Sequence, residues 1–303
     1  MIEEQINWPQ VRCSIREVLE IAVTKLKNAG VEQPIKDARI LLGYSLDKPW
    51  ERFYGKEREI IKSEQLHDYG QKVLRRCQRE PVSRIIGRRE FWNLELEITP
   101  FALDPRPDSE TLIEAALEKF PDRSRPLNIL DLGSGSGCLV LAALQEWQHS
   151  TGLGIDIDPH CVELAKANAR RNGLSDRVKF QAGDWSNNLD EKFDIVLCNP
   201  PYIPTNDIFK LDEEVRFFEP KKALDGGPDG LDCYVQLSSQ FRKLLTAHGL
   251  IFLEIGFHQK KQICEIMRIS GLDVIGIKKD IGQRDRCLIL SHKHCCPNGE
   301  ITL

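Results

Sequence analysis

The sequence lacks the features that mark several large classes of protein. Its longest unbroken apolar run, Cys138 to Leu144, is far shorter than the ~18 residues that a membrane-spanning helix needs. Neither sign of charge dominates, because 42 basic and 46 acidic residues give a net charge of -4. No global polycation therefore marks a nucleic-acid-binding chain. The N-terminus is acidic and has no apolar core, and we expect no signal peptide and no membrane association.

The ten cysteines do not form a recognisable framework. They are scattered, and no pair has Cys-x-x-Cys spacing. A chain of 303 residues is long enough to build its own core, so we expect reduced, buried thiols in a cytoplasmic protein. His292, His294, Cys295 and Cys296 resemble metal ligands in composition only, because their spacing matches no common zinc pattern. We therefore expect no metal site.

Residues 1–85 have the pattern of a small helical domain. Ser14 and Glu17 form a capping box that begins one helix, and apolar residues follow at helical spacing. Pro34 begins a second helix, and a third begins near Ser63. A helical domain of this size provides a separate surface beside the rest of the chain.

Arginines gather at the end of this helical region. Such a cluster binds an anionic partner, or complements a helix C-terminus and solvates a surface, and base rates favour the second interpretation. The residues are Arg75, Arg76, Arg79, Arg84, Arg88 and Arg89.

Residues 86–105 predict a β-hairpin that links two domains. Leu94, Leu96 and Ile98 alternate with polar residues, and Asn93 lies at the turn. The segment Pro105-Arg-Pro-Asp-Ser-Glu then caps a helix that runs to Phe120.

Residues 106–290 alternate between strand and helix patterns. This rhythm predicts a doubly wound, Rossmann-like α/β sheet. The last two runs leave no room for a helix between them, so they predict an antiparallel pair at one edge. Residues 291–303 are expected to form a polar tail. The apolar strand-like runs are 127–132, 153–157, 178–182, 193–198, 250–255, 274–277 and 287–290.

A glycine-rich loop provides the first candidate binding site. Asp131-Leu-Gly133-Ser134-Gly135-Ser136-Gly137 follows a predicted strand and begins a helix, and glycines there let a ligand approach the backbone. Asp156 ends the next predicted strand, where its carboxylate can accept hydrogen bonds from a ribose diol. The alternative is a glycine turn that only packs the helix on the strand.

The spacing of the glycines indicates which cofactor binds. A dinucleotide site expects Gly-x-Gly-x-x-Gly, whereas this loop has Gly-x-Gly-x-Gly, a spacing associated with S-adenosylmethionine. Asp131 suits a ligand that has a cationic amino group and a sulfonium. Trp185 follows the third strand of the domain and either flanks the adenine or packs in the core.

The second candidate site is Asn199-Pro200-Pro201-Tyr202, at the end of the fourth strand. The prolines stiffen the backbone and hold Asn199 in an extended conformation. The Asn199 side-chain oxygen and the Pro200 carbonyl can both accept hydrogen bonds from one planar -NH2 group, and Tyr202 offers a ring beside it. The alternative is a proline turn that ends a strand; Glu254, at the end of the fifth strand, is interpreted as an ordinary strand-end carboxylate.

Taken together, these motifs resemble those of the HemK-type protein-(glutamine) methyltransferases, which modify peptide chain release factors. The resemblance covers roughly residues 14 to 290. It implies that Gly133 through Gly137, Asp156, Trp185 and Asn199 contact S-adenosylmethionine, and that Asn199 through Tyr202 hold the target glutamine of a class 1 release factor. Asp104 departs from the family pattern, which usually has an apolar residue there. The motifs are Arg79-Glu-Pro81, Ile86-Gly87, Glu90-Phe-Trp92, Pro105–Glu110, Asp131–Gly137, Asp156, Asn199–Ile203, Phe218-Glu-Pro220, Ala223–Gly227, Asp229-Gly-Leu231 and Leu253–Gly256.

Three other functions share part of this pattern. A DNA or RNA amino-methyltransferase has both sites, but normally adds a strongly basic face or a base-recognition domain, so we expect no stable nucleic-acid binding. A non-catalytic cofactor-binding module is disfavoured by the intact Asn199 and Tyr202. A nicotinamide dehydrogenase is disfavoured by the glycine spacing.

Overall fold

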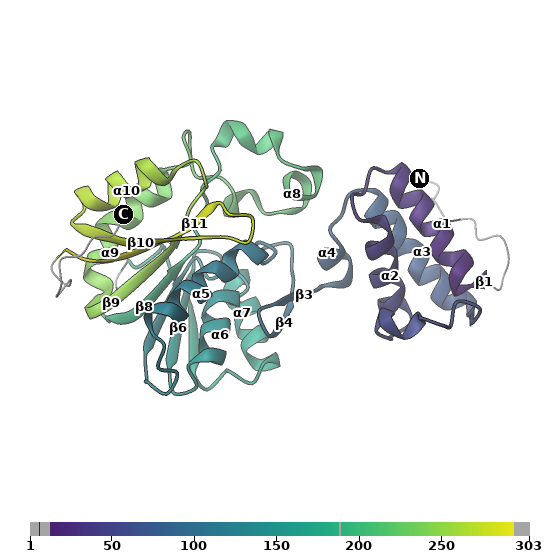
Figure 1. Cartoon of the computed structure of the whole chain (residues 1–303), viewed down its shortest axis with the longest axis horizontal. Coiled ribbons are helices and arrows are strands. Elements are labelled where there is room, and N and C mark those ends of the chain that lie inside the picture. The colour runs from purple at the N-terminus through teal and green to yellow at the C-terminus, as the bar shows by residue number, and fades with distance from the viewer. Residues whose placement is uncertain (1–5, 7–12, 188, 294–303) are drawn as a thin grey trace. The chain divides into compact units, whose positions relative to one another are not determined.

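The computed structural model describes residue 6 and residues 13–187 and 189–293, and it divides into two compact units (Figure 1). One unit is helical and extends to Gly87, and it also includes the later segment Asp212–Phe218. The other unit, which we call the sheet unit, begins at Arg88 and contains the large sheet. No described helix is both long and apolar enough to cross a membrane.

The first three helices of the helical unit begin where the sequence predicts them. The capping box is present, because Glu17 N donates to Ser14 Oγ at 3.4 Å and Ser14 N donates to Glu17 Oε2 at 2.8 Å. The apolar stripe of the first helix, including Val18 and Leu26, lies in the core of this unit. The elements are α1 (Ile15–Asn28), α2 (Pro34–Ser45), η1 (Trp50–Phe53), α3 (Ser63–Cys77), α4 (Val82–Ile86), α8 (Glu213–Phe218) and the short strands β1 (Cys13–Ser14) and β2 (Ile60–Ile61).

Ion pairs explain why α8 belongs to the helical unit. Glu214 of α8 accepts from Arg76 at 3.1 Å and from Arg79 at 2.7 Å. Arg76 also donates to Asp37 of α2 at 2.7 Å, and its side chain is largely buried. The predicted domain of residues 106–290 contains this segment without interruption, whereas the structure assigns it to the other unit. Hydrophobic periodicity cannot reveal a contact made by charges so distant in the sequence.

The predicted hairpin is confirmed as β3 (Arg88–Phe91) paired with β4 (Leu94–Glu97). Phe91 pairs with Leu94, so the turn consists of two residues, and Trp92 there has a left-handed φ of 55°. Glu110 fixes the turn, because its carboxylate accepts from Trp92 N at 2.8 Å. The hairpin thus rests on the first helix of the sheet unit.

The predicted doubly wound sheet is confirmed, with the strand order β10-β11-β9-β8-β5-β6-β7. The strands from β9 to β7 are parallel, and β11 is antiparallel to both β9 and the edge strand β10. The strands are β5 (Asn128–Leu132), β6 (Thr151–Asp156), β7 (Val178–Ala182), β8 (Phe193–Cys198), β9 (Leu245–Glu254), β10 (Leu272–Lys279) and β11 (Asp285–His292).

Alternate residues of each central strand face opposite layers. Ile129 of β5 packs in a cluster with the helices α5, α6 and α7, whereas Leu130 packs with α9 and α10. The helices are α5 (Glu110–Lys119), α6 (Cys138–Glu146), α7 (Pro159–Arg171), α9 (Asp232–Leu244) and α10 (Lys260–Ile269), with the short turns η2 (Pro107–Ser109), η3 (Thr205–Lys210) and η4 (Lys221–Ala223).

The end of the chain differs from the prediction in one respect. Ser291 and His292 belong to β11, where they pair with Asp273 and Leu272 of β10, so the strand extends into the expected polar tail. Backbone pairing with the neighbouring strand holds these two polar residues. The rest of the histidine- and cysteine-containing tail, residues 294–303, lies outside the described residues. Within the described ranges, no group of three or more His, Cys, Asp or Glu side chains forms a candidate metal site.

Candidate active site

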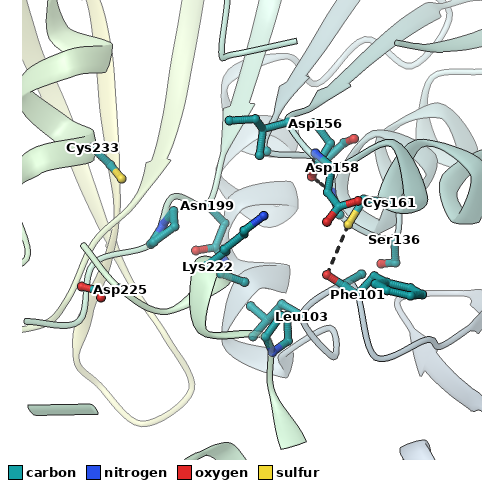
Figure 2. A pocket seen from close by; sticks show the side chains of 18 of the residues that line it. Phe101, Leu103, Ser136, Asp156, Asp158, Cys161, Asn199, Lys222, Asp225 and Cys233 are labelled. Carbon is teal, nitrogen blue, oxygen red and sulfur yellow. Dashed lines mark hydrogen bonds between the residues drawn. The ribbon is translucent and has the colours of Figure 1, made fainter. Parts of the chain in front are cut away.

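A cavity of about 890 Å³ lies in the sheet unit, at the ends of the parallel strands (Figure 2). This is the edge at which open α/β sheets bind their ligands. Its wall includes Asp156, the last residue of β6, and Asn199, which follows β8, and Figure 2 shows both side chains beside the same space. The cavity therefore brings the two predicted sites together.

The glycine loop follows β5 and forms part of this wall. Gly133, Gly135 and Gly137 have φ values of +72°, +53° and +81°, which L side chains rarely adopt. A Cβ atom on Gly133 would lie 3.3 Å from Cζ3 of Trp185, and one on Gly137 would lie 3.1 Å from Ala165 Cβ. Gly133 to Ser136 line the cavity, whereas Gly137 caps α6 and packs against α7. The loop thus leaves open space at the cavity and also packs α6 closely on its neighbours. The second property is the one expected of a turn that only packs the helix on the strand.

Asp156 ties the loop to the end of β6. Its Oδ2 accepts from Gly135 N at 2.7 Å, and its Oδ1 accepts from Asp158 N at 2.9 Å. Burial raises the pKa of this carboxyl, and these backbone hydrogen bonds oppose the rise. The carboxylate keeps unused lone pairs at the cavity wall, which can accept from a diol.

Asp131 does not line the cavity. It is fully buried, and its Oδ2 accepts from Val140 N at 3.2 Å, in the first turn of α6. Burial raises the pKa of this carboxyl to about 7. Asp131 Oδ1 and Ser134 Oγ are buried and have no hydrogen-bond partner in the described part of the chain. The loop therefore has unused polar atoms beside a space that suits a ligand.

Trp185 lines the cavity next to the loop. Its indole Nε1 donates to Gln236 Oε1 of α9 at 3.1 Å, and its backbone has a left-handed φ of 51°. The ring lies over Gly133, because a Cβ atom on Gly133 would be only 3.3 Å from Trp185 Cζ3. Trp185 thus packs on the loop and also presents an aromatic surface to the cavity.

The four-residue motif after β8 divides between the cavity wall and the interior. Asn199 and Pro201 line the cavity, whereas Pro200 and Tyr202 are not among the lining residues. The Tyr202 hydroxyl donates to Glu254 Oε1 at 3.2 Å and accepts from Arg286 at 3.4 Å. Contact of Pro200 and Tyr202 with a substrate therefore stays a prediction.

Two buried residues connect to Asn199 that the sequence patterns did not single out as functional. Ser109 Oγ accepts from Asn199 Nδ2 at 3.0 Å and donates to Glu254 Oε2 at 2.6 Å. Ser109 belongs to the segment that the sequence predicts as a helix cap, and the sequence pattern indicates only a strand-end carboxylate for Glu254. The signal in the sequence was that both residues lie within motifs of the family resemblance, Ser109 in Pro105–Glu110 and Glu254 in Leu253–Gly256.

Asp104, which departs from the family pattern, is stabilised by an ion pair with Arg89. Its side chain is buried and lies 3.7 Å from Arg89 Nε. Its backbone N donates to Glu219 at 3.1 Å, and Arg106 pairs with Glu219 at 2.7 Å. The segment that lines one side of the cavity is thus held by ion pairs. Phe101 on this segment accepts a hydrogen bond from Cys161 Sγ through its carbonyl, as Figure 2 shows.

Comparison with known proteins agrees with this geometry. Residues 17–87 match the family model of the PrmC N-terminal domain, and residues 124–270 match that of a methyltransferase domain. A methyltransferase domain implies a methyl donor. The catalytic domain of hMettl16 has a similar fold, with a TM-score of 0.56 at 18% identity over 75% of this chain and 82% of that one. At this identity the likeness concerns the fold alone.

Similarity to curated proteins extends along nearly the whole chain. A release factor glutamine methyltransferase from Rhodospirillum rubrum is 41% identical over 92% of this chain and 86% of its own length. Its counterpart from Caulobacter vibrioides is 38% identical over 88% of this chain and 93% of its own length. One from Aliivibrio fischeri is 35% identical over 90% and 95%, respectively. The chain therefore belongs to the release factor glutamine methyltransferase family.

Proposed function

We propose that this protein transfers a methyl group from S-adenosylmethionine to the side-chain amide nitrogen of the glutamine in the Gly-Gly-Gln loop of class 1 peptide chain release factors. The observation that carries the proposal is the Asn199 side chain, which lines the cavity beside the glycine loop. The names of the curated relatives support the choice of substrate. Release factors act in translation, so we infer a cytoplasmic location.

The residues around the cavity fit S-adenosylmethionine. The glycines leave a cradle that side chains would fill, Asp156 offers acceptor positions for the ribose, and Trp185 offers a ring for the adenine. Ser134 Oγ is an unpartnered polar atom on the same wall. Asp131, being buried behind the loop, acts on the cofactor by holding the first turn of α6. When bound, the cofactor supplies a methyl group activated by a sulfonium.

Asn199 and its neighbours prepare the accepting nitrogen. An amide nitrogen is a poor nucleophile because its lone pair is delocalised into the carbonyl. Asn199 Oδ1 and the Pro200 carbonyl are proposed to accept the two N–H bonds of the glutamine and to direct the lone pair toward the methyl group. Such orientation can lower a barrier by up to about 7–11 kcal/mol. With the cofactor bound, the glutamine nitrogen held by Asn199 and Pro200 would bond to the methyl carbon, and the methyl–sulfur bonding pair would stay on sulfur. The nitrogen would then release one proton to water, with no general base needed before the transfer.

The structure does not favour the alternative of an amino-methyltransferase acting on adenine or cytosine in DNA or RNA. Most arginines of the cluster are already paired with carboxylates within their own unit, which reduces their capacity to bind phosphates. The pairs are Arg75–Glu80, Arg76–Asp37, Arg79–Glu214, Arg88–Glu95 and Arg89–Asp104. The helical unit is instead proposed as a docking surface for the folded release factor.

Labelling of purified substrates tests the proposal. The protein is incubated with methyl-labelled S-adenosylmethionine and a class 1 release factor, and the modified peptide is located by mass spectrometry. We expect one methyl group on the loop glutamine. The matched control is the same release factor with that glutamine replaced by glutamate, which lacks the accepting -NH2 and should stay unlabelled. Label on the glutamate variant, or on DNA or ribosomal RNA under the same conditions, would contradict the assignment.

A further inference from the structure

A hydrogen-bonded series of three side chains leads from the cavity into the core of the sheet unit. Asn199 lines the cavity after β8, Ser109 ends η2, and Glu254 ends β9. The Asn199 Nδ2 to Ser109 Oγ distance is 3.0 Å, and the Ser109 Oγ to Glu254 Oε2 distance is 2.6 Å. Ser109 and Glu254 are each 2% exposed, so water does not compete for these hydrogen bonds.

The direction of each hydrogen bond in this series follows from Glu254. Burial raises the pKa of this carboxyl to about 7, so above that pH it is ionised and only accepts. The Ser109 hydroxyl must then donate its single proton to Glu254 and accept from its other neighbour. That neighbour is the Asn199 amide, which must present its -NH2 end to Ser109. The carbonyl end of Asn199 is left for the cavity, and Oδ1 has no partner among the described residues.

Two tyrosines hold Glu254 in place, and Arg286 in turn holds one of them. Tyr202 donates to its Oε1 at 3.2 Å, and Tyr234 donates to its backbone carbonyl at 3.0 Å. Arg286 donates to the Tyr202 hydroxyl at 3.4 Å and to Asp108 and Asp280, both at 3.0 Å. Glu254, the fixed end of this hydrogen-bonded series, therefore lies in the core. Asn199, whose orientation depends on it, lies at the cavity.

We propose that Ser109 and Glu254 are positioning residues that set the orientation of the Asn199 amide, so that its oxygen and not its nitrogen faces the methyl-accepting group. The inference rests on the proposed function for the identity of that group. An Asn amide rotated by half a turn would direct two donors at a substrate -NH2, which is also a donor. Such an arrangement repels the substrate nitrogen instead of aligning it. The orientation of one amide thus decides whether the site can hold its substrate for reaction.

The first experiment measures orientation without any reaction. Nitrogen-15 NMR at pH 8 follows the Asn199 side-chain amide, which is assigned by its disappearance in Asn199→Ala. We expect one amide proton with the slow solvent exchange of a buried hydrogen bond, and at least tenfold faster exchange in Ser109→Ala. Ser109→Thr keeps the hydroxyl and should restore slow exchange. Identical exchange in wild type and Ser109→Ala would overturn the inference, whatever the substrate proves to be.

The second experiment is a double-mutant cycle on the methyl-transfer rate. Ser109→Ala should lower kcat at least tenfold and change the Kd of the cofactor less than threefold, and Ser109→Thr should recover most of the rate. In an Asn199→Ala background, Ser109→Ala and Glu254→Gln should each change kcat less than threefold, because the side chain that they orient is gone. Equal losses in both backgrounds would show that Ser109 only supports packing and would refute the proposal.

A matched control separates this role from the loss of any buried serine. Ser150 is also buried, and its Oγ accepts from Leu127 N at 2.9 Å, but it does not line the cavity. Ser150→Ala should leave the kcat and the Asn199 signal as they are. If wild-type protein transfers no methyl group to the release factor, the proposed function fails, and the NMR result still decides whether Ser109 orients Asn199.

Discussion

The buried carboxyl of Asp131 predicts an unusual dependence of stability on pH. Its pKa is raised from 3.8 to about 7 by burial, with a smaller contribution from the nearby charge of Asp156. In the unfolded chain the same group ionises at its ordinary pKa. Because the folded pKa is the higher one, the stabilising contribution is complete below about pH 4 and is lost as pH rises through about 7.

The magnitude follows from the interval between the two pKa values. Each tenfold change in proton affinity corresponds to about 1.4 kcal/mol, so an interval from 3.8 to about 7 corresponds to about 4 kcal/mol. About 2 kcal/mol of this falls between pH 5.5 and pH 8.5, a range in which the protein can be studied without acid denaturation. Asp131→Asn removes the ionisation and keeps an oxygen that can accept from Val140 N.

Urea unfolding of both proteins at several pH values tests this reasoning. We expect the free energy of unfolding of wild type to fall relative to that of Asp131→Asn by about 2 kcal/mol between pH 5.5 and pH 8.5. Glu254, whose pKa burial also raises to about 7, is common to both proteins, so its contribution cancels in the difference. Parallel curves for the two proteins would show that the Asp131 carboxylate ionises at little cost in the folded state, and the burial argument would be wrong.

Three further predictions concern the two sites and the helical unit. Asp156→Ala should weaken S-adenosylmethionine binding by about 1.5–3 kcal/mol, roughly 10- to 150-fold in Kd by calorimetry, and unchanged affinity in a folded variant would remove Asp156 from the site. Asn199→Ala should lower kcat by about 10² or more while cofactor affinity is retained; a rate within a few fold of wild type would refute the positioning mechanism. Glu214→Gln leaves Arg76 and Arg79 without their shared carboxylate and should destabilise the helical unit by about 1–3 kcal/mol. Faster hydrogen exchange in α3 but not in α9 is the expected signature, and unchanged exchange in α3 would show that the ion pairs contribute little.

The sequence predicted those parts of the fold that depend on local patterns. The capping box at Ser14, the alternation in the hairpin and the strand–helix rhythm each arise from neighbouring residues, and each element was found where its pattern lies. The glycine loop was also readable, because left-handed backbone and close packing require glycine at fixed positions.

The parts that could not be predicted depend on contacts between distant residues. Ser109 and Glu254 are 145 residues apart, and neither carries a periodic or spacing signal that would connect them. The assignment of α8 to the helical unit likewise depends on charges, which hydrophobic periodicity does not report. The place of Asp131 before the loop predicted a position at the cavity. Side chains alternate between the two faces of β5, however, and this alternation places Asp131 in the layer between β5 and α6.

The helical unit is completed by a segment that the ribosome makes much later. Arg76 precedes its partner Glu214 by 138 residues, and Arg79 precedes it by 135. At about 5–20 residues per second, this separation amounts to roughly 7–28 seconds of synthesis. During that interval Asp37 can already pair with Arg76. The contacts that α8 makes with the helical unit cannot form until β8 and the Asn199 motif have been synthesised, because both precede α8 in the chain. The first unit to emerge is therefore completed only after β8, the strand that precedes the Asn199 motif, has been synthesised.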